Sequence, residues 1–469
     1  RRGCSLGAVR VLVDAGADLN RRDTIYDGTP LGWANYADQQ ENEGSRAKQY
    51  REIAAYLRQR GRGMRRRTER CTLAAAAGGP VVPIVPLLLL LVGAAAGCGG
   101  ERAPDPEASA PTFRGRVDLA IGEIAGEEPY LFSRVSGIAQ DERGRLFVAE
   151  WQANEIRTFD PSGDFLFRIG REGEGPGELR APCCLGFDLE GRLWVRDNGN
   201  ARYSVFELAG DSARFVTSVR MHHAAGNMWA PLTFDRRGRL IDVGVPAGLG
   251  SGIPGVLRLH TTLEGSLDST VTIESPPPEE VGVHLVDRPT ERGAARFFFY
   301  QPFGPRHLLA HGPRGAWAEA VSARYVVSLH PGEGAIVTIT GPERPGPPLS
   351  AREREEAEAS MAEDRRRAGV ADLPFGIPDR KPPLRGLFFD ATGRLWVERE
   401  VADGADREAD VYAPDGALAG HYVWPAAVGP PPQPAWVGET VLVGVTRDSL
   451  DVPRVARVRF EEDPGGGSR

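Results

Sequence analysis

Residues 136–148 read SGIAQDERGRLFV, and residues 185–195 repeat the pattern as LGFDLEGRLWV. A third copy, LTFDRRGRLI, covers 232–241, and another, FDATGRLWV, covers 389–397. The aspartates of the first three copies follow one another at intervals of 47 residues. Each copy predicts a short apolar strand that ends at Asp, a turn with Gly at a positive-φ position, and a return strand that begins with Arg-Leu.

A second predicted hairpin follows the first copy, at residues 156–169. Two hairpins make a four-stranded sheet, and a period of roughly 40–50 residues with four strands is typical of propeller blades. Weaker copies at 315–317 and 436–443 bring the number of units to six. We therefore predict a mainly β fold over residues 112–463, a six-bladed β-propeller of four-stranded antiparallel blades. Val117 to Ile124 should complete the last blade, because closure removes two exposed sheet edges.

Two connections between the predicted strands carry a family resemblance. Residues 170–179, GREGEGPGEL, are similar to the inter-blade connection of six-bladed, NHL-like propellers, and residues 197–203, DNGNARY, resemble a turn of the same group. Many proteins of that group are bacterial lipoproteins. The resemblance implies the propeller fold, but it implies no activity, because the group shares none.

Residues 64–98 resemble a bacterial lipoprotein signal, which must be set aside before the fold is considered. Arginines follow Met64, residues 72–97 carry no charge, and Ala-Ala-Gly-Cys at 95–98 has the shape of a lipobox. The resemblance implies lipidation of Cys98 and a membrane anchor. By resemblance to the enterobacterial sorting rule, Gly99 as the next residue implies the outer membrane of a bacterial envelope, facing the periplasm or the exterior. Residues 99–111 would form a polar linker.

A signal-anchor helix is the alternative for the same segment. Its 26 uncharged residues are long enough to cross a bilayer of about 30 Å. Prolines at 80, 83 and 86 interrupt the first half, however, and leave only residues 87–92 strongly apolar. This pattern favours the lipoprotein interpretation.

Residues 1–60 resemble part of an ankyrin-repeat array and would form a small α-helical remnant. The resemblance rests on VRVLVDAGADLN at 9–20 and DGTPLGWA at 27–34. About one and a half repeats are present, whereas about three are needed to bury their apolar faces. The segment is either the end of an upstream ankyrin protein or a cytoplasmic cap on an uncleaved membrane protein.

Composition sets broad limits on function. The chain has 469 residues, with 58 glycines and 38 prolines, which favours a turn-rich β architecture. A formal net charge of −7 gives no indication of nucleic-acid binding. Cys183 and Cys184 would meet an oxidising compartment after export and could form a vicinal disulfide. Alternatively, they are two small residues of a buried strand, one facing inward and one outward.

The sequence names no catalytic residue and no metal ligand. None of the eight histidines stands in a strong zinc-binding spacing, although His307 and His311 lie four residues apart. Glu172, Glu174 and Glu178 crowd a Gly-rich loop but lack the order of a calcium loop. We expect them to belong to a blade connection.

Four residues end predicted inner strands and either bind a ligand at a channel mouth or cap blade edges: Glu150, Trp151, Asp197 and Asn198. Two insertions separate the later units, and the second is expected to form a surface helix at 350–369. Its capping box is Ser350 with Glu353, and its apolar stripe contains only Ala357 and Met361.

Two functions remain open at this point. The first is an exported, membrane-anchored binding or scaffold module that recognises a protein, peptide or glycan partner and needs no cofactor. The alternative is a propeller enzyme of the lyase or lactonase type, with a divalent metal such as Ca²⁺ or Zn²⁺ in the central channel.

Overall fold

The structure is a computed structural model that describes residues 55–56, 110–222, 231–244, 256–290 and 293–464. The chain divides into two compact units, and residues 105–245 and 249–469 form the unit that contains all the strands below. The ankyrin-like segment apart from Ala55 and Tyr56, the signal segment and Cys98 lie outside the described residues. Within the described part, no helix combines the length and the apolar character needed to cross a membrane.

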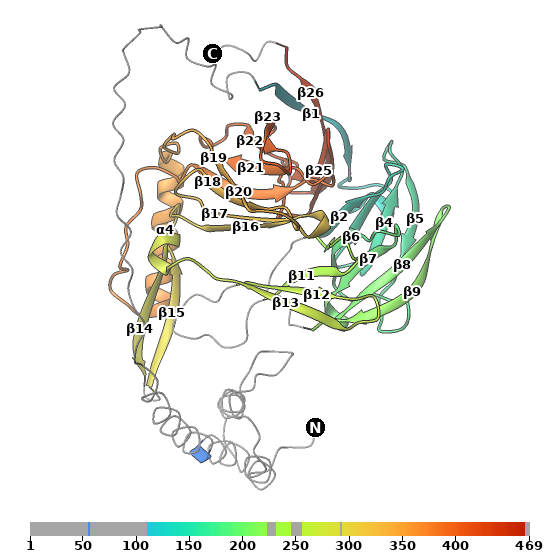
Figure 1. Cartoon of the computed structure of the whole chain (residues 1–469), viewed down its shortest axis with the longest axis horizontal. Coiled ribbons are helices and arrows are strands. Elements are labelled where there is room, and N and C mark those ends of the chain that lie inside the picture. Colours follow the sequence, from blue (N-terminus) through green and yellow to red (C-terminus); the bar gives the residue numbers. More distant parts are fainter. Residues whose placement is uncertain (1–54, 57–109, 223–230, 245–255, 291–292, 465–469) are drawn as a thin grey trace, which may run out of the picture. The chain divides into compact units, whose positions relative to one another are not determined.

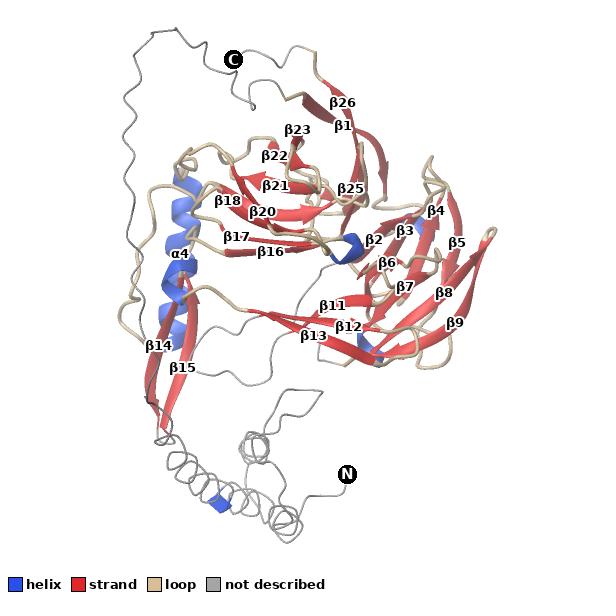
Figure 2. Ribbon diagram, in the orientation of Figure 1, coloured by secondary structure: helices blue, strands red, loops and turns tan. Residues whose placement is uncertain are grey.

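The strand-bearing unit is mainly β, with a propeller-like arrangement of four-stranded antiparallel sheets (Figures 1 and 2). The first sheet contains β2 (Val135–Gln140), β3 (Leu146–Glu150), β4 (Glu155–Phe159) and β5 (Phe165–Ile169). The second contains β6 (Pro182–Phe187), β7 (Leu193–Asp197), β8 (Arg202–Ala209) and β9 (Ser212–Arg220). The third contains β10 (Thr233–Phe234), β11 (Leu240–Gly244), β12 (Val256–Thr261) and β13 (Leu267–Ile273). The fourth contains β16 (His307–His311), β17 (Trp317–Val321), β18 (Val326–His330) and β19 (Val337–Thr340).

The remaining propeller strands form one eight-stranded sheet, in the order β20-β21-β22-β23-β1-β26-β25-β24. Its strands are β20 (Leu384–Phe389), β21 (Leu395–Arg399), β22 (Arg407–Tyr412), β23 (Leu418–Trp424), β24 (Ala435–Val437), β25 (Val441–Arg447), β26 (Pro453–Glu462) and β1 (Thr112–Ile121). β1 pairs with β26 antiparallel and with β23 parallel. The start of the segment therefore pairs with the last strand of the chain, as expected, but this strand begins at Thr112 rather than Val117. The ring of Phe113 stacks on the ring of Tyr422, with the ring centres 4.6 Å apart, and this contact holds the residues before Val117 against β23.

The repeated aspartate organises the first turn of four units. Its Oδ1 accepts hydrogen bonds from the backbone amides two and four residues later, and its Oδ2 accepts one from the Nε of the following arginine, all at 2.6–3.0 Å. The pairs are Asp141 with Arg145, Asp188 with Arg192, Asp235 with Arg239, and Asp390 with Arg394. The intervening glycine has a φ between 75° and 94° in every case, which a side chain would strain. The Asp-x-x-Gly-Arg repeat is thus a turn that satisfies its own backbone.

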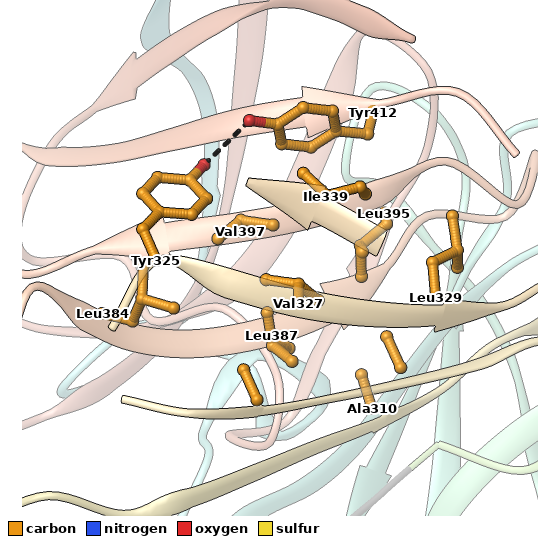
Figure 3. Close-up of a cluster of buried hydrophobic side chains, with 12 residues drawn as sticks. Ala310, Tyr325, Val327, Leu329, Ile339, Leu384, Leu387, Leu395, Val397 and Tyr412 are labelled. Atoms are coloured by element: carbon orange, nitrogen blue, oxygen red, sulfur yellow. Dashed lines mark hydrogen bonds between the residues drawn. The ribbon is translucent and has the colours of Figure 1, made fainter. Parts of the chain in front are cut away.

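Apolar side chains fill the space between neighbouring sheets. Figure 3 shows the cluster between β16–β19 and the strands β20, β21 and β22, where Val327 and Leu395 are fully buried. The hydroxyl groups of Tyr325 and Tyr412 lie 3.1 Å apart at one side of this cluster. A separate cluster around Trp396 and Trp424 includes Phe460 of β26 and packs against Phe113 of β1. The N-terminal strand therefore contributes to the same core as the C-terminal one.

Two insertions leave the propeller-like body. The first contains a two-stranded hairpin, β14 (Val283–Thr290) and β15 (Gly293–Tyr300), preceded by the 3-10 turn η4 (Pro278–Val281). The second contains the helix α4 (Ala351–Ala368). His284 stacks on Phe375 at 4.5 Å, so the two insertions are in contact. The other 3-10 turns are η2 (Glu128–Tyr130), η3 (Asn198–Asn200) and η5 (Pro313–Gly315).

The helix α4 has the ends that its sequence predicts. Ser350 and Glu353 form a reciprocal capping box, and Gly369 ends the helix in the left-handed region. Its buried face contains Ala357 and Met361, together with Glu353. The Nζ of Lys381 donates to Glu353 at 2.6 Å, and both side chains are buried. This buried ion pair, which the sequence pattern did not indicate, joins the helix to the segment before β20.

Candidate functional site

The first strands of several sheets converge on a cavity of about 830 Å³. Val135 of β2, Leu309 of β16 and Leu387 of β20 line it, as do Pro231 and Pro434, which lie just before β10 and β24. The first strand of each blade is the innermost one in a propeller, so this cavity lies where the inner strands meet. Its volume is within the range of about 300–1,000 Å³ that is typical of ligand pockets.

The β14–β15 hairpin contributes a further wall of this cavity. Val281 of η4, Val283 of β14 and Tyr300 of β15 are lining residues, and Tyr300 is half exposed. The lining as a whole is mainly apolar, with a few polar side chains among proline, valine, leucine and phenylalanine. Such a surface binds an apolar or aromatic body and uses the polar groups to orient it.

The charged side chains that line the cavity are all cationic among the described residues. They are Arg134, Arg306 and Arg447, and no described lining residue is an aspartate or glutamate. The guanidinium of Arg306 donates to the carbonyls of Gln301 and Pro305 at 2.7 and 2.8 Å. Burial lowers the pKa of Arg306, although it remains a cation at neutral pH. The cavity therefore favours ligands that carry negative charge.

Two histidines of β16 line the cavity, because alternate residues of a strand face the same side. His307 contacts Glu319 of the neighbouring strand, with Nε2 and Oε2 3.2 Å apart. The ring nitrogens of His311 are buried and have no hydrogen-bond partner among the described residues. Burial, reinforced by the charge of Arg258, lowers the pKa of His311 to about 3. This imidazole is therefore neutral at physiological pH.

The four residues expected at a channel mouth do not line this cavity. Glu150 and Asp197 end the second strands β3 and β7, are fully buried, and are absent from the described lining of the cavity, as are Trp151 and Asn198. The Glu150 carboxylate accepts hydrogen bonds from the amides of Ser133 and Arg134.

The other members of this group also have partners within the protein. Asp197 accepts bonds from the amide of Arg180 and the guanidinium of Arg202. Trp151 lies under the guanidinium of Arg134, at 4.8 Å. Asn198 donates from Nδ2 to the Sγ of Cys183 at 3.1 Å. In the structure these groups fasten the segments that lead into β2 and β6, and their contact with a ligand stays a prediction.

Cys183 and Cys184 are free thiols in the structure, and both are buried. The expectation that one faces inward and the other outward does not hold. Cys184 has a φ of 54°, and the pairing of β6 with β7 shifts register between Cys183 and Leu185. This β-bulge interrupts the alternation of side chains, so both thiols enter one apolar cluster with Trp194 and Tyr203.

The Gly-rich loop at 170–179 has the structural role that we expected. Glu178 accepts hydrogen bonds from the amide of Gly175 and from Arg171, and Glu174 pairs with Arg180. Across the described residues, no group of three or more histidine, cysteine, aspartate or glutamate side chains is arranged to hold a metal ion.

Sequence reasoning missed the residues that give the cavity its character. Arg134, Tyr300 and Arg306 stand outside the repeat, in connections or in the first insertion. Arg134 lies far along the chain from Tyr300 and Arg306, so the sequence gives no signal that it is close to them. The one usable signal was the spacing of His307 and His311, which a strand assignment would have placed on a single face.

No protein-family model matches the chain. NHL repeat-containing protein 3 of the mouse is 31% identical over 85 residues, which is 18% of this chain and 24% of that protein. The chain thus spans about a quarter of the length of this curated relative, and the match supports the NHL-like character of the repeat.

Solved structures with a similar course of the chain include three bacterial enzymes. Virginiamycin B lyase of Staphylococcus aureus is 12% identical, with a TM-score of 0.34, and the match covers 74% of this chain and 99% of that one. A gluconolactonase of Xanthomonas campestris is 15% identical, with a TM-score of 0.31 and coverages of 74% and 99%. The PQQ-bound aldose sugar dehydrogenase of Streptomyces coelicolor is 13% identical, with a TM-score of 0.36 and coverages of 75% and 100%. All three TM-scores are below 0.5.

Proposed function

We propose that this chain is an exported, lipid-anchored β-propeller of six blades that acts as a binding module. The eight-stranded sheet is read as two blades, one of β20–β23 and one of β24–β26 completed by β1. Four-stranded packing in the other sheets and the antiparallel pairing of β1 with β26 support this count. Anchoring at Cys98 would display the propeller from a bacterial envelope membrane, on the linker 99–111.

The cavity is the main observation that supports a binding function. It combines a volume suited to a ligand, mainly apolar walls and cationic lining residues such as Arg306. The ligand that fits this chemistry has an apolar or aromatic body and a negative charge, such as the carboxylate end of a peptide. The unpartnered nitrogens of His311 would accept or donate one further hydrogen bond.

The binding proposal predicts that the aromatic anion 1-anilinonaphthalene-8-sulfonate binds saturably to the folded protein. The neutral N-phenyl-1-naphthylamine should bind several-fold more weakly, since it lacks the charge that Arg134 and Arg306 attract. Leu309→Trp puts a bulky ring on a wall of the cavity and should weaken binding of the anion by about tenfold or more, a change of about 1.4 kcal/mol or more. Isothermal titration calorimetry measures both affinities.

The matched control is Val326→Trp, which adds the same ring at a site that is 44% exposed and outside the described cavity lining. This variant should bind the anion as the wild type does. Equal binding by Leu309→Trp and the wild type, with both variants folded by circular dichroism, would place the probe elsewhere and contradict the proposal.

The anchoring proposal predicts a lipidated Cys98 at the N-terminus when the chain is expressed from Met64 in a Gram-negative host. Thioether lipidation needs the thiol of Cys98, so Cys98→Ser should leave an uncleaved precursor without lipid. Mass spectrometry of the mature N-terminus tests this directly. A wild-type peptide that runs unmodified through Gly97 and Cys98 would refute the lipoprotein and support the signal-anchor alternative.

A further inference from the structure

A second cavity, of about 420 Å³, lies between the third and fourth sheets and is separate from the site described above. Its walls come from the β10–β11 turn, from β12, from η5 with the start of β17, and from the β18–β19 turn. Five arginines and only two carboxylates line it, in a chain whose formal net charge is −7. Positive charge is therefore concentrated here against the overall balance of the protein.

Arg258 of β12 differs from the other buried arginines of the described residues in its pairing. Four arginines are buried in the described part of the chain, and three of them have a carboxylate partner: Arg145 with Asp141, Arg157 with Glu155, and Arg196 with Asp242. Arg258 is 4% exposed and has no carboxylate within 4 Å among the described residues. A buried cation without a counterion is costly, and proteins generally avoid it.

The contacts of Arg258 leave part of its guanidinium unused. Nη2 donates to the carbonyl of Gly315 at 3.1 Å, and the group lies 5.6 Å from the ring centre of Trp317. Its Nε is buried and has no hydrogen-bond partner in the structure. Burial lowers the pKa of Arg258 to about 10, and the charge of Asp235 only partly offsets that effect.

Three other side chains of this cavity, those of His260, Arg237 and Arg314, are also incompletely satisfied. His260, two residues along β12, has two buried ring nitrogens without hydrogen-bond partners. Arg237 and Arg314 line the cavity from exposed turns and form no ion pair with any described residue. Asp235, the nearest acid, already accepts hydrogen bonds from Arg239. Donors therefore outnumber acceptors around this cavity.

The turns that enclose the cavity are closely fitted. Gly332, in the β18–β19 turn, has a φ of 86°, and a Cβ on it would come within 2.6 Å of the carbonyl oxygen of Arg314. Only glycine allows the two turns to approach in this way. The approach holds one wall of the cavity against the segment that carries Arg314.

We infer that this cavity binds a tetrahedral oxyanion, either a phosphate or a sulfate group, with Arg258 as its buried counter-charge and His260, Arg237 and Arg314 as further donors. Guanidinium groups suit such anions because they present several donors in a plane. The group could be a free ion or the ester of a sugar, and the same donors would bind it in either form.

The experiment measures thermal unfolding and calorimetric binding of the whole protein at pH 7 and constant ionic strength. Phosphate or sulfate at about 50 mM should raise the melting temperature by about 3 °C over sodium chloride, because an anion that binds only the folded state stabilises it. Glucose 6-phosphate and glucose 6-sulfate form the second arm. Tighter binding of an ester than of its free ion identifies an esterified ligand, and equal binding identifies the ion alone; both support the site.

Arg258→Met separates binding from structure. Without anion this variant should melt within about 2 °C of the wild type, since the buried charge disappears with its donors. It should lose the response to phosphate and sulfate entirely. Arg237→Ala, at an exposed position, is the second variant, and its affinity for the anion should fall several-fold without any change in folding.

The control Arg171→Met removes a guanidinium whose side chain is 81% exposed, on a different part of the surface, and should respond to anions as the wild type does. Two outcomes would overturn the inference. One is a response to phosphate and sulfate no larger than that to sodium chloride. The other is an undiminished response in both Arg258→Met and Arg237→Ala.

Discussion

Deletion of Thr112–Ile121 from the full chain should abolish cooperative folding of the strand-bearing unit. β1 is hydrogen-bonded on both sides, to β26 and to β23, so its loss leaves two unpaired edges. It also removes Ile121, which is 3% exposed and packs with Phe132 and Val455, and Phe113, which packs on Tyr422. We expect a loss of at least about 5 kcal/mol, which approaches the whole stability of an ordinary domain.

The measurement is chemical unfolding followed by circular dichroism, with hydrogen exchange to report on β26. A synthetic peptide of residues 110–122, added to the deletion variant, should restore part of the protection by inserting as the missing strand. An undiminished unfolding midpoint in the deletion variant would show that β1 is an accessory strand and would remove the support for ring closure.

The β architecture was predictable from sequence because it depends on local, repeated signals. The pairing of the N-terminal strand with the last strand was predictable for a different reason, since closure removes two exposed sheet edges. The turn at Asp188 satisfies its own backbone and its own arginine, so a window of about ten residues contains all of its determinants. The prediction began the closing strand at Val117, five residues after its actual start at Thr112. Apolar and polar residues alternate only weakly in the first half of this strand, and Phe113 there stacks on Tyr422, which is distant in sequence.

The cavity could not be predicted in the same way. Arg134 comes from the connection before β2, whereas Tyr300 and Arg306 come from the end of the first insertion, and only the folded chain brings Arg134 to the other two. Arg258 is a second example. It is notable because it is buried without a carboxylate partner among the described residues, and no sequence pattern indicates this. At Cys184 a single left-handed residue overrode the alternation on which a strand argument depends.

Asp390→Ala should destabilise the protein more than alanine at any of the other three repeated aspartates, because the Asp390 side chain is the most deeply buried of the four. Its carboxylate accepts hydrogen bonds from the amides of Thr392 and Arg394, from the Nε of Arg394 and from the indole of Trp396. Alanine leaves these donors without a partner and strands the Arg394 charge beside the ring of Tyr422. Unsatisfied buried donors cost about 1–3 kcal/mol each, and partial rehydration of an exposed turn recovers some of this, so we expect a loss of about 4 kcal/mol.

Asp415→Ala is the matched control, because Asp415 occupies another turn of the same sheet and its carboxylate accepts one exposed hydrogen bond, from the amide of Ala417. It should cost no more than about 1 kcal/mol. The loss of stability in Asp390→Asn should lie between those of the two alanine variants. The amide oxygen of asparagine still accepts hydrogen bonds from the backbone amides, but it forms no ion pair with Arg394. Urea unfolding at pH 7 gives all three values on one scale. If Asp390→Ala and Asp415→Ala were equally mild, the aspartate of the repeat would be a turn preference and not the centre of each turn, because a buried acceptor shared by so many donors cannot be removed without cost.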